Sequence, residues 1–396
     1  METNTIYCGD NIEVMKHYIP DNSIDLIYAD PPFFSNKQYE VLWGDGYELR
    51  SFEDRWKGGI NNYIAWMEPR LRECHRVLKE KGTMYLHCDS HANAHLRILM
   101  DKIFDEKNFR NEIIWYYRGG GVPKKGFGSR HDTIFFYSKG SDYIFNVDDV
   151  RQEYSEDSKE RLKYVARAFR GKRVYDKYRP NPKGKHPDDV WQIQPTMPSS
   201  KERFGYPTQK PERLLEPIIK ASSNPMDIVL DPFCGCGTTI AVAHKLGRRW
   251  IGIDVSPTAC KLMAKRMRSI GAKEIKIIGL PKTLEELKAL APFEFQNWVF
   301  EKLHGRVNPK KVGDMGIDGW IELDIPTQVK QSENVGRIVV DKFETAIRRY
   351  GKKQGVIIAF SFTKDAYEEV ARVKLLDNMN KLDIKLKTAE EILKET

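Results

Sequence analysis

The tetrapeptide Asp30-Pro31-Pro32-Phe33 combines a carboxylate, a backbone carbonyl and an aromatic ring directly after an apolar run. The carboxylate of Asp30 and the carbonyl of Pro31 could accept the two hydrogens of an amino group on a planar ring, and so direct the nitrogen lone pair towards an electrophile. Pro32 would stiffen the loop, and Phe33 would stack on the ring. The alternative is a strand end without chemistry, because two prolines fix φ and remove two backbone donors.

A second loop, Phe233-Cys234-Gly235-Cys236-Gly237, follows Asp231-Pro232 and precedes a helical pattern. Glycines let the backbone approach a ligand closely, and a helix N-terminus offers unpaired N–H groups. Asp254 lies 19 residues after Gly235, near the spacing of about 20 at which an acid binds ribose hydroxyls. The loop therefore predicts a nucleotide-type cofactor site. The alternatives are a tight turn without a ligand, and a dehydrogenase loop, which would need a third glycine.

A third pattern lies near the C-terminus, where Asp318 is followed by Gln328 and Lys330. An acid at one strand end and Gln-x-Lys on the next strand would converge on one spot. Asp318 and the Gln328 carbonyl could hold Mg²⁺, while the ammonium of Lys330 positions an attacking water. The alternative is a set of unrelated surface residues.

The segment from Lys159 to Lys185 carries eleven Lys and Arg residues against two acids, a local charge of 11 − 2 = +9. Four aromatic residues lie among these bases. The whole chain has 65 basic and 56 acidic residues and a pI of about 9.0, which favours polyanionic partners. Bases beside aromatic rings suit a nucleic-acid strand, although a solvated basic helix is the alternative. The candidate DNA contacts are Lys159, Arg161, Lys163, Arg167, Arg170, Lys172, Arg173, Lys177 and Arg179.

Other reactive side chains give weaker patterns. His87, His91 and His95 have the spacing of one helix face, but no second group of ligands accompanies them, so we interpret them as hydrogen-bonded or solvent-facing. The six cysteines form no CxxC pair, which is typical of a reduced, cytoplasmic protein. No stretch approaches the roughly 18 apolar residues of a membrane helix.

The elements that must position these residues follow an α/β order. Strands are expected at 23–29, 83–86, 228–230 and 250–254, and helices at 63–78, 238–246 and 295–303. Residues 141–203 are basic, aromatic and weakly periodic, which predicts an insert or small subdomain. A boundary near 279–285 divides the chain of 396 residues into domains at 1–280 and 285–396.

The two N-terminal motifs together resemble the amino-group DNA methyltransferases that use S-adenosylmethionine. Asp30 to Phe33 matches their [DNS]PP[YFW] motif, and Phe233 to Gly237 matches their FxGxG loop. The order of the motifs resembles the β class, with residues 141–203 as the target-recognition insert. The resemblance covers roughly residues 4–270, and it implies a Rossmann-like methyltransferase sheet. It departs from the commonest pattern in having Phe33 instead of Tyr.

The resemblance also assigns roles to residues. Asp30, Pro31, Pro32 and Phe33 would hold the target base, and Asp254 would bind the ribose. The remaining cofactor contacts would be Asp10, Thr208, Gln209, Lys210, Asp231, Phe233, Gly235 and Gly237. An acid at the first motif position goes more often with adenine N6 than with cytosine N4, which stays the alternative.

The C-terminal pattern resembles the Mrr-like members of the PD-(D/E)xK nucleases, with Asp318, Gln328 and Lys330 carrying the match. This implies a smaller α/β domain like that of restriction endonucleases, with Mg²⁺ bound only if the nuclease is active. Where that family often has a helix Glu, this chain offers Gln296, Glu294 or Glu301. An inactive fold kept for DNA binding is the alternative.

The sequence therefore predicts a site-specific DNA adenine-N6 methyltransferase of a restriction-modification system, acting on double-stranded DNA in the cytoplasm. A homodimer and a separate restriction subunit are the plausible protein partners. The rival interpretations are a DNA-binding protein with two inert folds, a methyltransferase acting on protein or RNA, and a bifunctional methyltransferase-nuclease.

Overall fold

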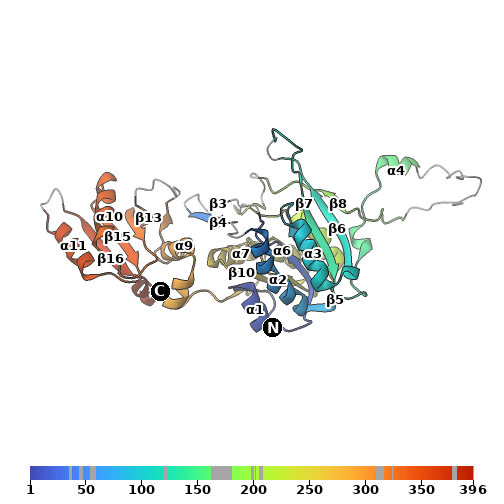
Figure 1. The fold of residues 1–396 in the computed structure, drawn as a ribbon, viewed down its shortest axis with the longest axis horizontal. Helices are drawn as coiled ribbons and strands as arrows, with labels where there is room; N and C mark the ends of the chain where they lie inside the picture. Colours follow the sequence, from blue (N-terminus) through green and yellow to red (C-terminus); the bar gives the residue numbers. More distant parts are fainter. Residues whose placement is uncertain are drawn as a thin grey trace, which may run out of the picture.

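The computed structural model shows two sheet-centred units joined end to end (Figure 1). It describes residues 1–34, 59–119, 123–161, 181–197, 200, 202–204, 208–308, 316–322, 324–376 and 381–395, together with the backbone of two strands at 38–43 and 48–53. Within these residues, no helix has both the length and the apolar character that crossing a membrane requires.

The larger unit is built on a nine-stranded sheet. In spatial order its strands are β11 (Lys276–Ile278), β1 (Thr5–Cys8), β10 (Arg249–Asp254), β9 (Ile228–Asp231), β2 (Ile24–Ala29), β5 (Leu78–Cys88), β7 (His131–Ser138), β6 (Phe109–Tyr116) and β8 (Val190–Gln192). Neighbouring strands from β11 to β5 are parallel, and β7 is antiparallel to both β5 and β6. The carboxyl ends of the parallel strands therefore meet at one edge of the sheet.

Helices cover both faces of this sheet. One face carries α1 (Asn11–Tyr18), α2 (Ile60–Val77) and α3 (Asn93–Phe104), and the other carries α5 (Glu212–Ser222), α6 (Thr238–Lys245) and α7 (Pro257–Ser269). Side chains alternate along the strands, so Tyr7 enters the first core and Ile6 the second. This two-sided burial explains why the parallel strands read as continuous apolar runs.

The smaller unit has a five-stranded sheet and begins after β11. Its strands, in spatial order, are β12 (Arg306–Val307), β13 (Gly319–Ile321), β14 (Ile325–Val329), β15 (Gln354–Ala359) and β16 (Asp383–Thr388). Its helices are α8 (Leu284–Ala289), α9 (Pro292–Lys302), α10 (Arg337–Arg349), α11 (Lys364–Lys374) and α12 (Ala389–Glu395). We call residues 284–395 the C-terminal unit. The boundary between 280 and 285 stays a prediction, with β11 ending before it.

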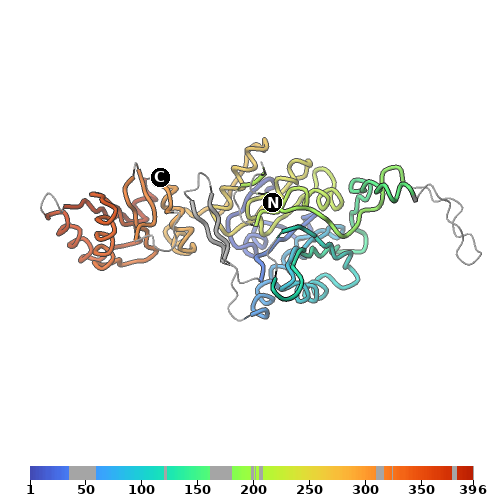
Figure 2. The backbone as a smooth tube through the Cα atoms, turned by 90° about the horizontal axis from the view of Figure 1, so that it is seen from above, coloured from blue at the N-terminus to red at the C-terminus, as the bar shows by residue number. Residues whose placement is uncertain are grey.

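The remaining elements are short. The strands β3 (Gln38–Trp43) and β4 (Glu48–Glu53) pair with each other in antiparallel fashion. Helix α4 (Glu156–Arg161) lies away from the main sheet (Figure 2), and two 3₁₀ turns span Glu106–Asn108 and Val147–Val150.

The mixed α/β fold is confirmed, but two details differ from the sequence-based expectations. The expected insert at 141–203 contains β8, which pairs with β6 and so extends the main sheet. His87 lies on β5, whereas His95 lies on α3. The three histidines therefore do not share a helix face, because the chain leaves the strand after Cys88 before α3 begins.

Candidate functional site

Both N-terminal motifs open into one cavity of about 650 Å³ at the carboxyl edge of the parallel strands. Residues 30–33 follow β2, residues 232–235 follow β9, and Asp254 ends β10. Neighbouring parallel strands end at the same edge, which explains how residues about 200 positions apart in the sequence line one space. Ligands of open α/β sheets bind at this edge.

The glycine loop is held in a conformation that few other residues adopt. Gly235 and Gly237 have φ values of 52° and 79°, and a Cβ atom on Gly237 would lie 2.9 Å from Cγ of Met263. Gly237 also precedes the first turn of α6. The positive φ therefore favours glycine at both positions, and at Gly237 the close approach to α7 adds a second reason.

Asp254 joins the glycine loop to the end of β10. Its Oδ2 accepts a hydrogen bond of 2.8 Å from the Gly235 N–H, and its Oδ1 accepts one of 2.9 Å from the Ser256 N–H. Burial raises the pKa of Asp254 to about 6, although the two N–H groups oppose the shift.

Asp231 is the second buried acid of the cavity. Its Oδ1 accepts a 3.0 Å hydrogen bond from the Phe233 N–H. Burial raises its pKa to about 7, and the negative charges of Asp30 and Asp254 add to the rise. A positively charged ligand in the cavity would favour the ionised form of both acids.

The two carboxylate oxygens of Asp30 have different surroundings, with Oδ1 lying 3.8 Å from Nδ1 of His87, beyond hydrogen-bond distance. Oδ2 lies 2.5 Å from Nζ of Lys210. Oδ1 is buried and has no hydrogen-bond partner among the described residues. The Lys210 ammonium also lies 5.0 Å from the centre of the Phe33 ring. A buried carboxylate oxygen without a donor is costly, so this atom calls for a donor from outside the protein.

Asn11 also lines this cavity and has a buried acceptor atom without a donor among the described residues. Its Nδ2 donates a 3.0 Å hydrogen bond to the carbonyl of Pro232, while its Oδ1 is buried without a partner among the described residues. Asn11 was not among the residues predicted from the sequence. Its position directly after Asp10, a predicted cofactor residue, could have indicated it.

The other predicted cofactor residues also line the cavity, and two of them, Asp10 and Gln209, already make hydrogen bonds within the protein. Asp10 caps α1 through a 2.9 Å bond from the Ile12 N–H and contacts Arg70 at 2.5 Å. Gln209 accepts a 2.9 Å hydrogen bond from the Phe204 N–H, which holds its own loop in place. Thr208 lines the cavity and is exposed.

A buried hydrogen-bonded chain behind Asp30 was also missed. The Tyr28 hydroxyl lies 2.7 Å from Nδ1 of His87, and Nε2 of His87 lies 3.4 Å from Oδ2 of Asp132. Tyr117 donates to the other oxygen of Asp132 at 3.1 Å. Burial alone would raise the pKa of Asp132, but the contacts with His87 and Tyr117 lower it overall. His87 is therefore a structural partner of strand-end residues and not a metal ligand candidate with His91 and His95.

Most of the predicted DNA contacts lie outside the described residues. These are Lys163, Arg167, Arg170, Lys172, Arg173, Lys177 and Arg179. Lys159 is described on α4, where it pairs with Glu156 at 2.7 Å, and Arg161 ends that helix.

The C-terminal unit brings Asp318 beside the strand of Gln328 and Lys330. Oδ2 of Asp318 accepts a 2.8 Å hydrogen bond from the Val329 N–H. Oε1 of Gln328 is buried without a partner among the described residues, and Lys330 follows two positions later, just after β14. Of the three candidate helix residues, Gln296 contacts Asp318, through a 3.1 Å bond to its carbonyl.

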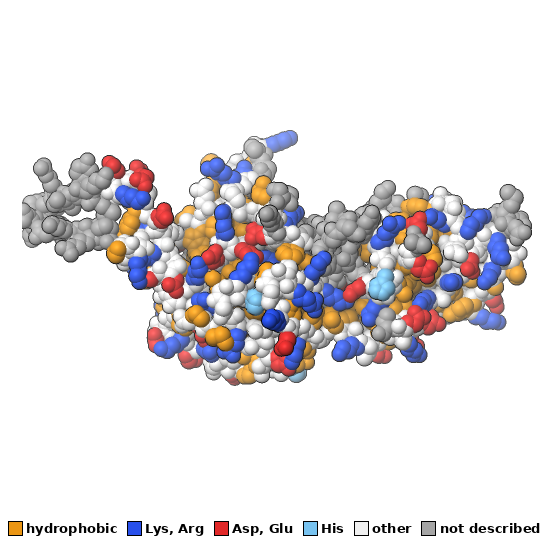
Figure 3. Space-filling model, turned by 180° about the vertical axis from the view of Figure 1, so that it is seen from behind, with side chains coloured by type: hydrophobic (Ala, Val, Ile, Leu, Met, Phe, Trp, Pro, Cys, Tyr) orange, Lys and Arg blue, Asp and Glu red, His pale blue; other side chains and the backbone are white. Residues whose placement is uncertain are grey.

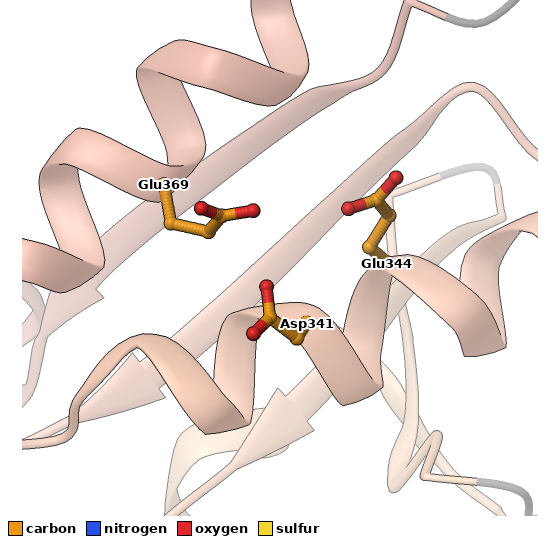
Figure 4. A group of neighbouring side chains, drawn as sticks. All are labelled: Asp341, Glu344 and Glu369. Atoms are coloured by element: carbon orange, nitrogen blue, oxygen red, sulfur yellow. The ribbon is translucent and has the colours of Figure 1, made fainter.

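A different acidic group stands out elsewhere in the C-terminal unit. Asp341 and Glu344 on α10 point towards Glu369 on α11, and their carboxylates lie close enough together to hold a metal ion (Figure 4). The group does not include Asp318, the predicted metal ligand. Arginines neutralise it, since Arg372 lies 3.0 Å from Glu344 and Arg337 lies 3.2 Å from Glu369. We interpret the trio as an ion-pair network between two helices.

Comparison with known proteins identifies both units. A family described as DNA methylase matches residues 24–266. The chain belongs to this DNA methylase family. A second family, described as restriction endonuclease, matches residues 287–386.

Two relatives, at 36% and 41% identity, agree with the match to the DNA methylase family. The DNA adenine methyltransferase YhdJ of Escherichia coli (strain K12) is 36% identical over 273 residues, which cover 67% of this chain and 83% of that protein. The type II methyltransferase M1.MboII of Moraxella bovis is 41% identical over 269 residues, covering 65% of this chain and 93% of that protein. The solved PvuII DNA methyltransferase (cytosine-N4-specific) is 17% identical with a TM-score of 0.47, and the alignment covers 70% of this chain and 97% of that one.

The comparisons confirm the methyltransferase family and the restriction-endonuclease-like character of the C-terminal unit, both predicted from short motifs. This DNA methylase therefore carries a nuclease-type unit after its methyltransferase sheet.

Proposed function

We propose that this DNA methylase transfers a methyl group from S-adenosylmethionine to N6 of adenine in double-stranded DNA. The observation that carries the proposal is Asp30 at the wall of a cavity shared with the glycine loop, with its buried Oδ1 left without a hydrogen-bond donor among the described residues. The relative YhdJ bears the name DNA adenine methyltransferase, which supports adenine as the base.

The cofactor fits the residues that surround the glycine loop. The cavity of about 650 Å³ lies within the usual range of cofactor sites, about 300–1,000 Å³. Asp254 would bind the ribose, and the open Oδ1 of Asn11 would accept from the amino-acid end. When bound, S-adenosylmethionine supplies an activated methyl group on a positively charged sulfur. The buried acids Asp231 and Asp254 favour that positive charge.

The target base would bind at residues 30–33. Oδ1 of Asp30 and the carbonyl of Pro31 would accept the two hydrogens of the amino group, and Phe33 would stack on the ring. Lys210 holds the other oxygen of Asp30, which fixes the orientation of the carboxylate. The base must leave the duplex to reach this wall, as in other enzymes that react with a base.

Replacing Asp30 by Ala tests this role. We expect methyl transfer to DNA to fall by at least about 10²-fold, because the amino group loses its carboxylate acceptor, while S-adenosylmethionine still binds. The measurement is transfer of a labelled methyl group, with binding followed by calorimetry. Transfer at the wild-type rate by this variant would remove Asp30 from the site.

The C-terminal unit supports a second candidate function, DNA cleavage with Mg²⁺. The observation that favours it is Oε1 of Gln328, which is buried without a partner among the described residues, on the strand that contacts the Asp318 carboxylate. Oxygen ligands of this kind suit Mg²⁺. Lys330 would position the attacking water.

Cleavage of unmethylated DNA in Mg²⁺, measured on supercoiled plasmid, tests the second function. We expect Lys330→Ala to abolish nicking and to leave methyl transfer unchanged, since the two sites lie in different units. If the wild-type protein cuts no DNA with any divalent cation, the unit is an inert fold.

A further inference from the structure

The C-terminal unit contacts a helix of the methylase unit close to the cofactor edge of the sheet. Its helix α9 packs against α7, the helix that follows Asp254 (Figure 1). Ser256 lies between Asp254 and α7 and caps that helix, with its Oγ accepting a 3.0 Å hydrogen bond from the Ala259 N–H. The residues at the start of α7 therefore lie beside the cofactor pocket and also contact the C-terminal unit.

Glu294 on α9 binds this helix start with both carboxylate oxygens. Oε1 accepts a 2.6 Å hydrogen bond from Oγ of Ser256, and Oε2 accepts a 2.5 Å hydrogen bond from Oγ1 of Thr258. A negative charge at a helix N-terminus is favourable. Glu294, a residue of the restriction-endonuclease-like match, thus stabilises a loop of the methylase.

Ser256 connects Glu294 to the acid that would bind the ribose. Its side chain donates to Glu294, while its backbone N–H donates to Oδ1 of Asp254. The other oxygen of Asp254 binds the Gly235 N–H of the glycine loop. Burial is the main cause of the raised pKa of Asp254, and the negative charge of Glu294 adds to the rise. The two carboxylates therefore influence each other.

We propose that Glu294 is a positioning residue for the cofactor pocket, so that the C-terminal unit and cofactor binding are energetically coupled. The inference rests on the proposed function, because it takes Asp254 as part of the S-adenosylmethionine site. Coupling of this kind is reciprocal. A docked C-terminal unit tightens cofactor binding, and the bound cofactor in turn tightens the contact between α7 and α9.

The chain supplies a matched control for this contact. Glu301 lies on the same helix α9 and pairs with Lys261 of α7. The Glu301–Lys261 pair also joins the two units, but Ser256 and Thr258 are not part of it. Glu294→Gln and Glu301→Gln therefore make the same chemical change on the same helix, and only the first alters the loop that follows Asp254.

The experiment measures methyl transfer and cofactor binding with the full chain. For Glu294→Gln, we expect the KM and Kd for S-adenosylmethionine to rise about three- to tenfold, the scale of one lost hydrogen bond, with kcat little changed. Glu301→Gln should keep the wild-type KM. Hydrogen exchange in α9 should slow when S-adenosylmethionine is added to the wild-type protein, and this effect should be lost in Glu294→Gln.

The outcomes separate the inference from the proposed function. If wild-type protein binds S-adenosylmethionine and methylates DNA, but Glu294→Gln has the wild-type KM, the coupling is absent. An equal rise of KM in both Gln variants would also overturn it, because general loosening of the two units would then explain the effect. If wild-type protein binds no S-adenosylmethionine, both proposals fail. Should Glu294→Gln unfold, Thr258→Val removes one of the same two hydrogen bonds and should raise the KM by a smaller factor.

Discussion

At Asp30 the two carboxylate oxygens have different surroundings, and this asymmetry explains the proposed chemistry. Lys210 holds Oδ2, whereas Oδ1 is buried with no hydrogen-bond donor among the described residues. The ion pair with Lys210 thus orients the carboxylate, and in the proposed reaction the second oxygen accepts a hydrogen bond from the substrate. Preorganised acceptors of this kind need no rearrangement during the reaction.

Asp231 gives a pH prediction at the residue scale. Its folded pKa of about 7 lies above the unfolded value of about 3.9, so the folded protein holds a proton that the unfolded chain has lost between these pH values. Wild-type stability therefore falls as pH rises towards 7, by on the order of 1 kcal/mol per pH unit from this group. Asp231→Asn should lack this contribution.

Urea unfolding of both proteins at pH 5, 6, 7 and 8, without cofactor, measures the effect. The difference in unfolding free energy, wild type minus Asp231→Asn, should decrease from pH 5 to 7 and level off above pH 7. Parallel curves for the two proteins would show that Asp231 keeps an ordinary pKa.

The sequence revealed the site residues that lie next to one another in the chain, and missed those that meet only in the fold. The acid, prolines and ring of residues 30–33 form one recognisable run. His87 and Asp132 are 45 positions apart, and they meet because β7 runs antiparallel beside β5. Only the pairing of these strands reveals the buried chain behind Asp30.

Among the elements, the turn between β9 and α6 is constrained both by its backbone conformation and by crowding. Gly237 has a φ of 79°, and a Cβ atom there would lie 2.9 Å from Cγ of Met263. Gly271 has a φ of 88°, but a Cβ atom there would have no neighbour within 4 Å. A comparison of Ala substitutions at these two positions therefore separates the free-energy cost of a positive φ from the cost of crowding.

We expect Gly237→Ala to destabilise the protein by about 1–3 kcal/mol and to weaken the binding of S-adenosylmethionine. Gly271→Ala should carry only the cost of its φ and keep wild-type binding. Thermal unfolding and calorimetric titration measure both effects. Equal losses in the two variants would mean that the approach of the loop to α7 has no energetic role.

The four strands and three helices that periodicity predicted are all present, since buried parallel strands are apolar throughout. The strands at 23–29 and 250–254 match β2 and β10 within one residue. The order of the sheet and the place of β8 could not be predicted, because pairing between distant strands depends on tertiary packing. Strand β8 has only three residues, two of them exposed, so it gives no apolar pattern to find.

On the scale of the whole molecule, charge is unevenly distributed along the chain. The segment 159–185 holds 11 of the 65 basic residues and 2 of the 56 acids, which leaves 54 of each sign elsewhere. Acidic and basic side chains are accordingly interspersed over the described residues visible in Figure 3. The net charge of +9 thus resides in the segment proposed to contact DNA.

This distribution predicts a steep salt dependence of DNA binding. If six to ten of these bases neutralise phosphates, affinity should fall by about 10³–10⁵ between 50 and 200 mM salt. Replacing Lys172, Arg173, Lys177 and Arg179 by Ala should flatten the slope by about three to four units, as followed by fluorescence anisotropy. Ala at Lys16, Lys107, Lys273 and Lys276, four exposed lysines of the methylase unit outside this segment, serves as the control and should leave the slope unchanged. A slope that the first set does not alter would place the phosphate contacts elsewhere.

Methylation of adenine at N6 is tested most directly by identifying the methylated nucleoside. Wild-type protein, labelled S-adenosylmethionine and unmethylated genomic DNA are incubated with EDTA, and the DNA is digested to nucleosides that are identified by mass. We expect N6-methyladenine as the labelled product. N4-methylcytosine would contradict the assignment of the base, and the absence of any labelled nucleoside would contradict the proposed reaction.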